Sequence, residues 1–165
     1  MEMKYWFTAD EHYGHANIIK FCNRPFSTVE EMNEAMICNH NALVRHGDIV
    51  VHGGDFTLGK DSGKYIEQLR GDHIFIKGSH DRWMDKDSIQ IWERTIQGIY
   101  VVVCHYAMRV WPRSHYGSWQ LYAHSHGNLE PIGNQHDIGV DNNNFCPSSF
   151  NQIRDIMDSK CVVKM

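Results

Sequence analysis

Aspartate and histidine residues recur in this sequence in short alternating pairs that directly follow apolar runs. Asp10 and His12 follow the run KYWFTA, and His124 and His126 follow WQLYA. Residues two apart in an extended chain point to the same side, so each pair can grip one site. Asp and His side chains together suit first-row metals such as Mn, Fe, Co, Ni or Zn rather than Ca or Mg. The spacing therefore predicts two sets of metal ligands from distant parts of the chain.

Further residues of the same kinds follow other apolar runs. They are Asp55 in GGD, His80 and Asp81 in SHD, and His105 after IYVVVC. Ligands gather at the carboxyl ends of strands in an α/β sheet, so these side chains are expected to converge. Two metals about 3.5–4 Å apart could share one carboxylate, acidify a bridging water and clamp a phosphoryl group. Each pattern alone is common by chance, so the prediction rests on their repeated placement after apolar runs.

Short apolar strands alternate with helical patterns along the first half of the chain. Strands are expected at residues 4–9, 48–52, 73–77, 99–104, 119–123 and 161–164. Helices are expected at residues 14–22, 28–46, 60–69 and from 148 onward. For the second helix we predict a capping box of Ser27 and Glu30 and an end at Gly47. This alternation predicts an α/β domain with a mixed sheet.

Composition narrows the class of protein. The 165 residues are 42% apolar and 22% charged, with a net charge of −4, which fits a globular domain and lacks the basic field of nucleic-acid binders. No apolar run approaches the roughly 18 residues of a membrane span, and the N-terminus lacks the pattern of a signal peptide. The five cysteines form no CxxC pair, so we expect free thiols and a cytoplasmic protein.

Histidine is frequent, with twelve residues in the chain. Four of them lack metal-type neighbours, and we expect them to face solvent: His40, His46, His73 and His136. His52 precedes GGD and is expected to be buried or to support the site.

The motifs, in this order, resemble those of the calcineurin-like metallophosphoesterases. The family blocks D-x-H, G-D-x-x-x-G, G-N-H-D/E, a lone H and G-H-x-H correspond here to DEH (10–12), GDFTLG (54–59), GSHD (78–81), CH (104–105) and AHSH (123–126). The segments FTAD-x-H-x-GH-N and NRPF are similar to the small cap-less branch found in bacteria and phages. The resemblance covers nearly the whole chain and implies a four-layer αββα sandwich with mixed sheets, in which residues 1–165 form one metallophosphoesterase domain.

The resemblance implies a role for each motif residue. The ligands of a first metal would be Asp10, His12 and His126. The bridging carboxylate would be Asp55, and the other ligands of a second metal would be His105, His124 and the residue at position 79. The implied cofactors are two divalent transition-metal ions, manganese first, with iron, nickel, cobalt or zinc as alternatives. His80, oriented by Asp81, would protonate or stabilise the departing oxygen.

Position 79 departs from the family pattern, because Ser79 stands where the family has asparagine. A serine hydroxyl is shorter and a poorer neutral ligand than an amide oxygen, so water is expected to complete the shell of the second metal. Three interpretations are open: a substitution introduced to impair turnover, natural variation, and drift away from catalysis. The other ligand positions are intact, which weighs against the third.

Four residues are candidates for binding a phosphate ester: His15, Arg24, Arg109 and Arg113. Arginine binds phosphate well, and aromatic residues in the segment 106–119 could stack on bases, so a nucleotide or nucleic-acid end is a candidate substrate. The alternatives are a surface hairpin for 106–119, a helix-end salt bridge for Arg24 and support of the metals for His15.

The sequence therefore predicts a metallophosphoesterase in which two metals activate a hydroxide and His80 assists the leaving group. The missing cap implies a wide opening, which suits a phosphodiester at least as well as a phosphomonoester. Two other functions stay open: a non-catalytic metal-binding or protein-interaction scaffold on the same fold, and a protein with a single metal.

Overall fold

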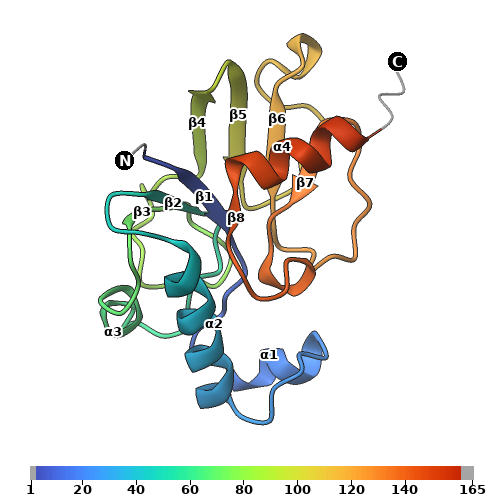
Figure 1. The fold of residues 1–165 in the computed structure, drawn as a ribbon. Helices are drawn as coiled ribbons and strands as arrows, with labels where there is room; N and C mark the ends of the chain where they lie inside the picture. The colour runs from blue at the N-terminus through green and yellow to red at the C-terminus, as the bar shows by residue number, and fades with distance from the viewer. Residues whose placement is uncertain (1–2, 161–165) are drawn as a thin grey trace.

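Two mixed four-stranded sheets form the centre of the protein in a computed structural model, which describes residues 3–160 (Figure 1). The first sheet has the order β3-β2-β1-β8, with strands Asp72–Phe75, Ile49–His52, Tyr5–Thr8 and Ser148–Ser149. The second has the order β4-β5-β6-β7, with strands Ile91–Ile96, Ile99–Cys104, Trp119–Tyr122 and Gln135–Asp137. Only β8 and β4 run antiparallel to their neighbours. The α/β class and the mixed sheets are confirmed, and the strand predicted at 161–164 lies outside the described residues.

One hydrophobic core lies between the two sheets. Phe7 of β1 is fully buried in one cluster with Val103 of β5 and Leu121 of β6, so the two sheets face each other. Helix α4 (Phe150–Ser159) adds three apolar side chains to this cluster: Phe150, Ile153 and Met157. The alternation of side chains along a strand explains this pattern, because every second residue points to the same face.

A second core fills the space between the first sheet and its helices. These helices are α1 (Ala16–Phe21), α2 (Val29–Leu43) and α3 (Gly63–Ile66). Met32 and Met36 of α2 pack there against Tyr13 and Phe56. Loops cover the outer face of the second sheet: the Gln120 side chain donates to the backbone oxygen of Tyr106, and Tyr122 donates to that of Leu129.

Helix α2 begins one residue later and ends earlier than predicted. Thr28 is the N-cap and accepts a 3.1 Å bond from the backbone nitrogen of Glu31, whose carboxylate accepts from that of Ser27. The helix ends at Leu43, before Gly47, because Val44 turns to an extended conformation and is buried against Trp6. A capped helix after Pro147 is confirmed, with a capping box formed by Ser149 and Gln152.

Other helices and strands also differ from the prediction, because the local sequence pattern does not determine them. Of the predicted helix 60–69 only Gly63–Ile66 is regular, and the next residues continue as three-residue turns. Strands β4, β7 and β8 were not predicted, since their sequences IWERTI, QHD and SS are polar or very short. No helix among residues 3–160 has the length and apolar character needed to cross a membrane. The four described cysteines are free thiols, and the cytoplasmic location stays a prediction.

A group of buried and half-buried histidines supports the loop that carries the first motif. The Nδ1 atom of His52 lies 2.6 Å from Oε1 of Glu11, and its Nε2 lies 3.0 Å from Nδ1 of His73. The ring of His40 lies 5.7 Å from that of His73. Burial lowers the pKa of His52 to about 3 and those of His40 and His73 to about 4, and it raises the pKa of Glu11 to about 8.

The prediction that four histidines face solvent is therefore wrong for three of them. His40 is buried because its helical spacing from Met36 places it on the inner face of α2. His73 and His136 are half-buried, and His46 alone is exposed as expected. His52 is buried, as predicted.

Acid is expected to destabilise the fold through these neutral histidines. His40 titrates near 6.5 when unfolded but at about 4 when folded, so its stabilisation is complete above pH 6.5 and is lost as the pH falls toward 4. For this one group the loss at pH 5 is about 2 kcal/mol. In metal-free protein, His40→Gln should therefore flatten the decrease in Tm between pH 7 and pH 5. The exposed control His46→Gln should leave that slope unchanged, and an equal slope in both variants would refute the assignment.

Candidate metal centre

The loops that follow the parallel strands of both sheets meet at one place. Ala9, directly after β1, forms a parallel bridge with Gly139, two residues beyond β7, and so joins the two sheets at the carboxyl ends of these strands. Next to this bridge, the backbone nitrogen of His124 donates to Oδ2 of Asp10 at 2.9 Å. Residues that are distant in the sequence are thus adjacent where the strands end, as expected for ligand sites in α/β sheets.

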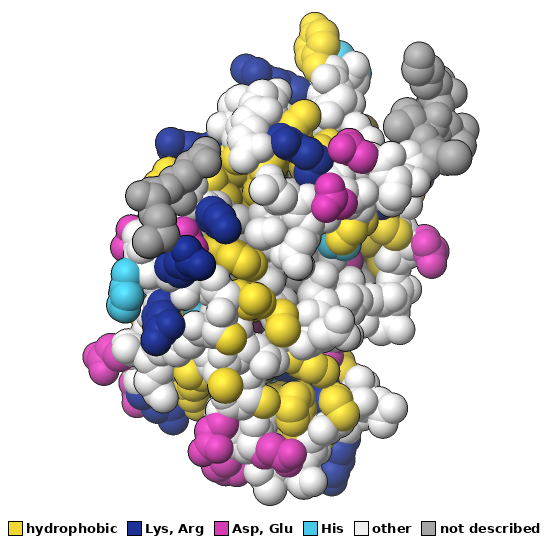
Figure 2. Space-filling view, viewed as in Figure 1, with side chains coloured by type: hydrophobic (Ala, Val, Ile, Leu, Met, Phe, Trp, Pro, Cys, Tyr) yellow, Lys and Arg dark blue, Asp and Glu magenta, His cyan; other side chains and the backbone are white. Residues whose placement is uncertain are grey.

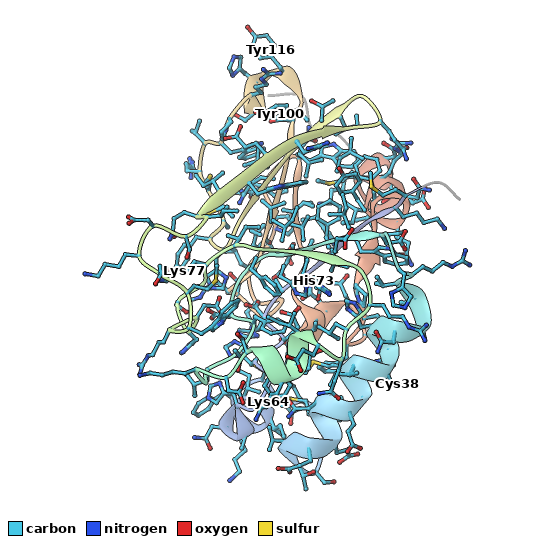
Figure 3. All side chains as sticks on the ribbon, turned by 90° about the vertical axis from the view of Figure 1, so that its left-hand side faces the viewer. Cys38, Lys64, His73, Lys77, Tyr100 and Tyr116 are labelled. Carbon is cyan, nitrogen blue, oxygen red and sulfur yellow. The ribbon has the colours of Figure 1, made fainter. Side chains whose placement is uncertain are left out.

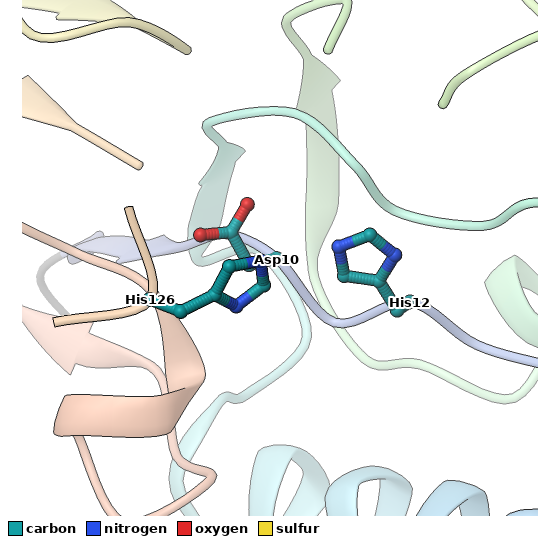
Figure 4. A group of neighbouring side chains, drawn as sticks. All are labelled: Asp10, His12 and His126. Atoms are coloured by element: carbon teal, nitrogen blue, oxygen red, sulfur yellow. The ribbon is translucent and has the colours of Figure 1, made fainter. Parts of the chain in front are cut away.

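Six of the predicted ligands form two neighbouring groups. In each group, potential ligand atoms lie within 4.8 Å of one another. The first group is Asp10, His12 and His126, drawn in Figure 4, and the second is Asp55, His105 and His124. Oδ2 of Asp55 lies between the groups, 3.7 Å from Nε2 of His12 and 3.4 Å from Nε2 of His105.

The backbone at these residues is strained. Five of the six have positive φ angles, between 47° and 68°: Asp10, His12, Asp55, His124 and His126. Residues other than glycine disfavour this left-handed region. They adopt it only where the surrounding structure holds them there, which is common at functional sites. The strained residues are therefore the same ones that the sequence motifs predicted as metal ligands.

Buried atoms without hydrogen-bond partners show that the groups suit a cation. Among the described residues they include Asp10 Oδ1, His12 Nε2 and His105 Nε2. Nδ1 of His105 lies 3.0 Å from the carbonyl oxygen of Gly53, which can only accept, so the proton is on Nδ1 and Nε2 carries a lone pair. This lone pair faces a carboxylate oxygen, an arrangement that a metal ion between them would make favourable.

The charge states of the side chains also suit metal binding. Burial lowers the pKa of His12 to about 3, so its imidazole is neutral at pH 7. Burial acts to raise the pKa of Asp55, but the neighbouring His105 ring and the backbone nitrogen of His80 outweigh it and hold the pKa below its usual range. Neutral imidazoles and an ionised carboxylate are the forms that bind metals.

The GSHD loop surrounds the Asp55 carboxylate. Ser79 donates its hydroxyl to Oδ2 of Asp55 at 2.9 Å, and the backbone nitrogen of His80 donates to Oδ1 at 2.7 Å. The His80 side chain is 42% exposed, and its Nε2 lies 4.0 Å from Oδ2. A Cβ atom added to Gly78 would lie 2.2 Å from Oδ1, so this position requires glycine.

Asp81 does not orient the His80 ring, contrary to the expectation. It is buried, and its carboxylate accepts from the backbone nitrogens of Asp55, Phe56 and Gly78 at 2.7, 2.9 and 2.8 Å. It also accepts from Nε1 of Trp83 at 3.0 Å. Asp81 therefore ties the loop after β2 to the loop after β3 and positions Asp55.

Arg24 does not face a substrate, so its assignment to phosphate binding is wrong. The side chain is fully buried and forms two 2.8 Å bonds to the carboxylate of Asp141. It also donates to the backbone oxygens of Asp10 and Glu11 at 2.6 and 2.9 Å. Asp141 in turn lies 2.7 Å from Nδ1 of His126, so Arg24 braces both chain segments of the first group. The motif search missed Asp141, although it stands in the segment IGVDNNN that resembles the family.

The two other arginines lie away from the centre. Arg113 stacks on Tyr100, at the start of β5, whereas His105 follows the end of that strand. Figure 3 shows Tyr100 beside Tyr116 at one end of the molecule. Arg109 is exposed, and the neighbouring Met108 is bonded to the side chains of Gln120 and Gln135, near the beginnings of β6 and β7. The segment 106–119 therefore leaves the centre, and the prediction that Arg113 binds substrate is wrong.

His15 is close to the first group, as expected. Its Nδ1 lies 3.2 Å from Nδ1 of His12, and its ring lies 5.9 Å from that of His80. If Nε2 of His12 binds metal, the proton of His12 is on Nδ1 and His15 accepts it. The Nε2–H group of His15 is then available to a ligand.

Replacing Asp81 by asparagine should reveal its structural role. Asp81→Asn would set an amide NH₂ against buried backbone N–H groups, so we expect a loss of about 2–4 kcal/mol of folding stability together with weaker metal binding. His80→Asn is the matched control and should keep both properties. Unchanged metal affinity in Asp81→Asn, measured by calorimetry, would show that Asp81 does not position Asp55.

Comparison with known proteins agrees with this architecture. No family profile matches the chain. The uncharacterized protein MJ1445 of Methanocaldococcus jannaschii is 34% identical, over 98% of this chain and 95% of that protein. The structure of AQ665 from Aquifex aeolicus, a protein of unknown function, has a TM-score of 0.74 and 21% identity over 94% of this chain and 100% of that chain. A single mutant of Vps29 from Entamoeba histolytica has a TM-score of 0.51 and 15% identity over 83% of this chain and 73% of that chain. The chain belongs to the same family as MJ1445 and has the calcineurin-like metallophosphoesterase fold.

Proposed function

We propose that this protein is a metal-dependent phosphoesterase that hydrolyses phosphodiesters or phosphomonoesters. The observation that carries the proposal is the position of Asp55. A single oxygen of its carboxylate lies 3.7 Å from Nε2 of His12 and 3.4 Å from Nε2 of His105, and both nitrogens are buried without hydrogen-bond partners. A carboxylate so placed can serve two cations, one in each ligand group.

Two divalent first-row ions are the proposed cofactors, with manganese as the first candidate and iron, cobalt, nickel or zinc as alternatives. The first would be held by Asp10, His12, His126 and Asp55. The second would be held by Asp55, His105, His124 and either Ser79 or water. When bound, such ions lower the pKa of coordinated water and neutralise charge on phosphate oxygens.

The side chains at the open edge of the centre would bind and protonate the ester. His80 is the proposed acid, because its ring is part-exposed yet adjacent to Asp55, so Nε2 can give a proton to the oxygen that leaves phosphorus. His15 is the proposed phosphate donor through its Nε2–H group. Burial, and then the neighbouring His80, lower the pKa of His15, which keeps this ring neutral at pH 7.

Ser79 is expected to weaken the second ion rather than to abolish the site. Its hydroxyl donates to Oδ2 of Asp55, the carboxylate that would serve both ligand groups. A hydrogen bond to this oxygen competes with a metal for its lone pair. The non-catalytic scaffold stays the alternative function, and hydrolysis measured together with metal content decides between them.

The test is hydrolysis of bis-p-nitrophenyl phosphate and p-nitrophenyl phosphate with Mn²⁺, with bound metal counted in the same samples. We expect Ser79→Asn to bind the second ion more tightly and to be at least about 10-fold faster, which corresponds to about 1.4 kcal/mol. Asp55→Asn is the control and should lose both ions and all activity.

Equal activity of the unaltered protein and Ser79→Asn, with two ions bound in each, would show that serine is a tolerated ligand position. If neither protein binds metal or hydrolyses either ester, the scaffold function replaces the enzymatic one.

A further inference from the structure

Two exposed aromatic side chains flank the metal centre. Tyr106 directly follows His105, is 48% exposed, and places its ring 4.9 Å from the rings of both His105 and His124. Phe21, the last residue of α1, is 75% exposed, and its ring lies 6.4 Å from that of His15 in an edge-to-face arrangement. Large aromatic side chains that stay exposed beside a polar site are a common feature of ligand-binding surfaces.

The ring contacts place these two residues at opposite sides of the shared carboxylate. Phe21 contacts His15, whose Nδ1 lies 3.2 Å from His12 in the first ligand group. Tyr106 contacts His105 and His124, which belong to the second group. Asp55 lies between the two groups, so a phosphate bound there would have one aromatic ring on each side.

The distribution of charge favours a small ligand over a long polyanion. Arg24 is buried and paired with Asp141, so it does not face a ligand. Arg113 stacks on Tyr100, away from the centre. The net charge is −4, and the face shown in Figure 2 carries both acidic and basic side chains. Proteins that hold long nucleic-acid strands neutralise many phosphates with lysine and arginine, and a chain with a net charge of −4 is poorly suited to that role.

We propose that Tyr106 and Phe21 are stacking platforms that select small phosphodiesters with an aromatic ring on each side of phosphorus, of which a dinucleotide is the biological class. This inference rests on the proposed function, since it concerns the substrate of the same centre. Stacking of one base on an aromatic side chain changes affinity by about 10-fold, so each platform should contribute a measurable preference.

The experiment compares a dinucleotide, bis-p-nitrophenyl phosphate and methyl p-nitrophenyl phosphate as substrates of the metal-loaded protein. We expect Tyr106→Ala and Phe21→Ser each to raise KM for the dinucleotide about 10-fold, with a much smaller effect on the methyl ester. Tyr106→Phe keeps the ring and should restore the dinucleotide KM. Tyr116→Ala removes an 81% exposed ring at the far end of the molecule and should change nothing.

Binding of a dinucleotide with a non-hydrolysable methylphosphonate linkage, measured by calorimetry in the presence of Mn²⁺, separates this inference from the catalytic one. Weaker binding by Tyr106→Ala supports the platforms even if the protein hydrolyses nothing. Equal KM values of Tyr106→Ala and the unaltered protein for all diesters, while hydrolysis persists, would overturn the platforms and leave the phosphoesterase intact. Much tighter, salt-dependent binding of a decanucleotide than of the dinucleotide would overturn the proposed substrate size.

Discussion

The buried carboxylate of Asp81 fixes the position of Asp55, and the rest of the centre is built around that position. Its two oxygens accept hydrogen bonds from backbone nitrogens on both the loop after β2 and the loop after β3. Two separate loops are thereby held in a single arrangement, although neither has regular secondary structure. A carboxylate that accepts from several N–H donors is held rigidly, so it can keep a strained residue such as Asp55 in the left-handed conformation.

Arg24 has the same function on the other side of the centre. Its guanidinium group joins the loop after β1 to Asp141, which in turn orients His126. The planar fork of arginine suits this bridging position, because it donates to a carboxylate and to two carbonyl groups at once. Together Arg24 and Asp81 explain how the candidate ligands, which come from four separate loops, keep their positions although the four described cysteines are all free thiols.

The ligand motifs could be predicted from the sequence because each one follows an apolar strand, and strand ends converge in this class of fold. The residues that hold the ligands could not be predicted in this way. Arg24 is separated from Asp141 by 117 positions, and only the folded chain shows that its charge is buried rather than presented to a substrate. Likewise, the sequence of residues 106–119 does not show that the segment runs from the centre to the start of β5, which removes Arg113 from the site. The exposed strand β4 and the two-residue β8 lack the apolar alternation on which strand prediction depends.

Position 79 differs from its neighbours in the GSHD loop, because its side chain can change while the contacts that hold Asp55 through the backbone stay the same. Asp55 is held by the backbone nitrogen of His80 and, through its own backbone, by Asp81, while the side chain of Ser79 is on the exposed surface. Gly78, by contrast, accepts no side chain at all. In the proposed two-ion centre, a single codon change at position 79 would therefore alter the affinity for one ion without repacking the protein. Along a lineage of related chains, this position would then offer a one-step route between the proposed two-ion form and a one-ion form, with both forms folded.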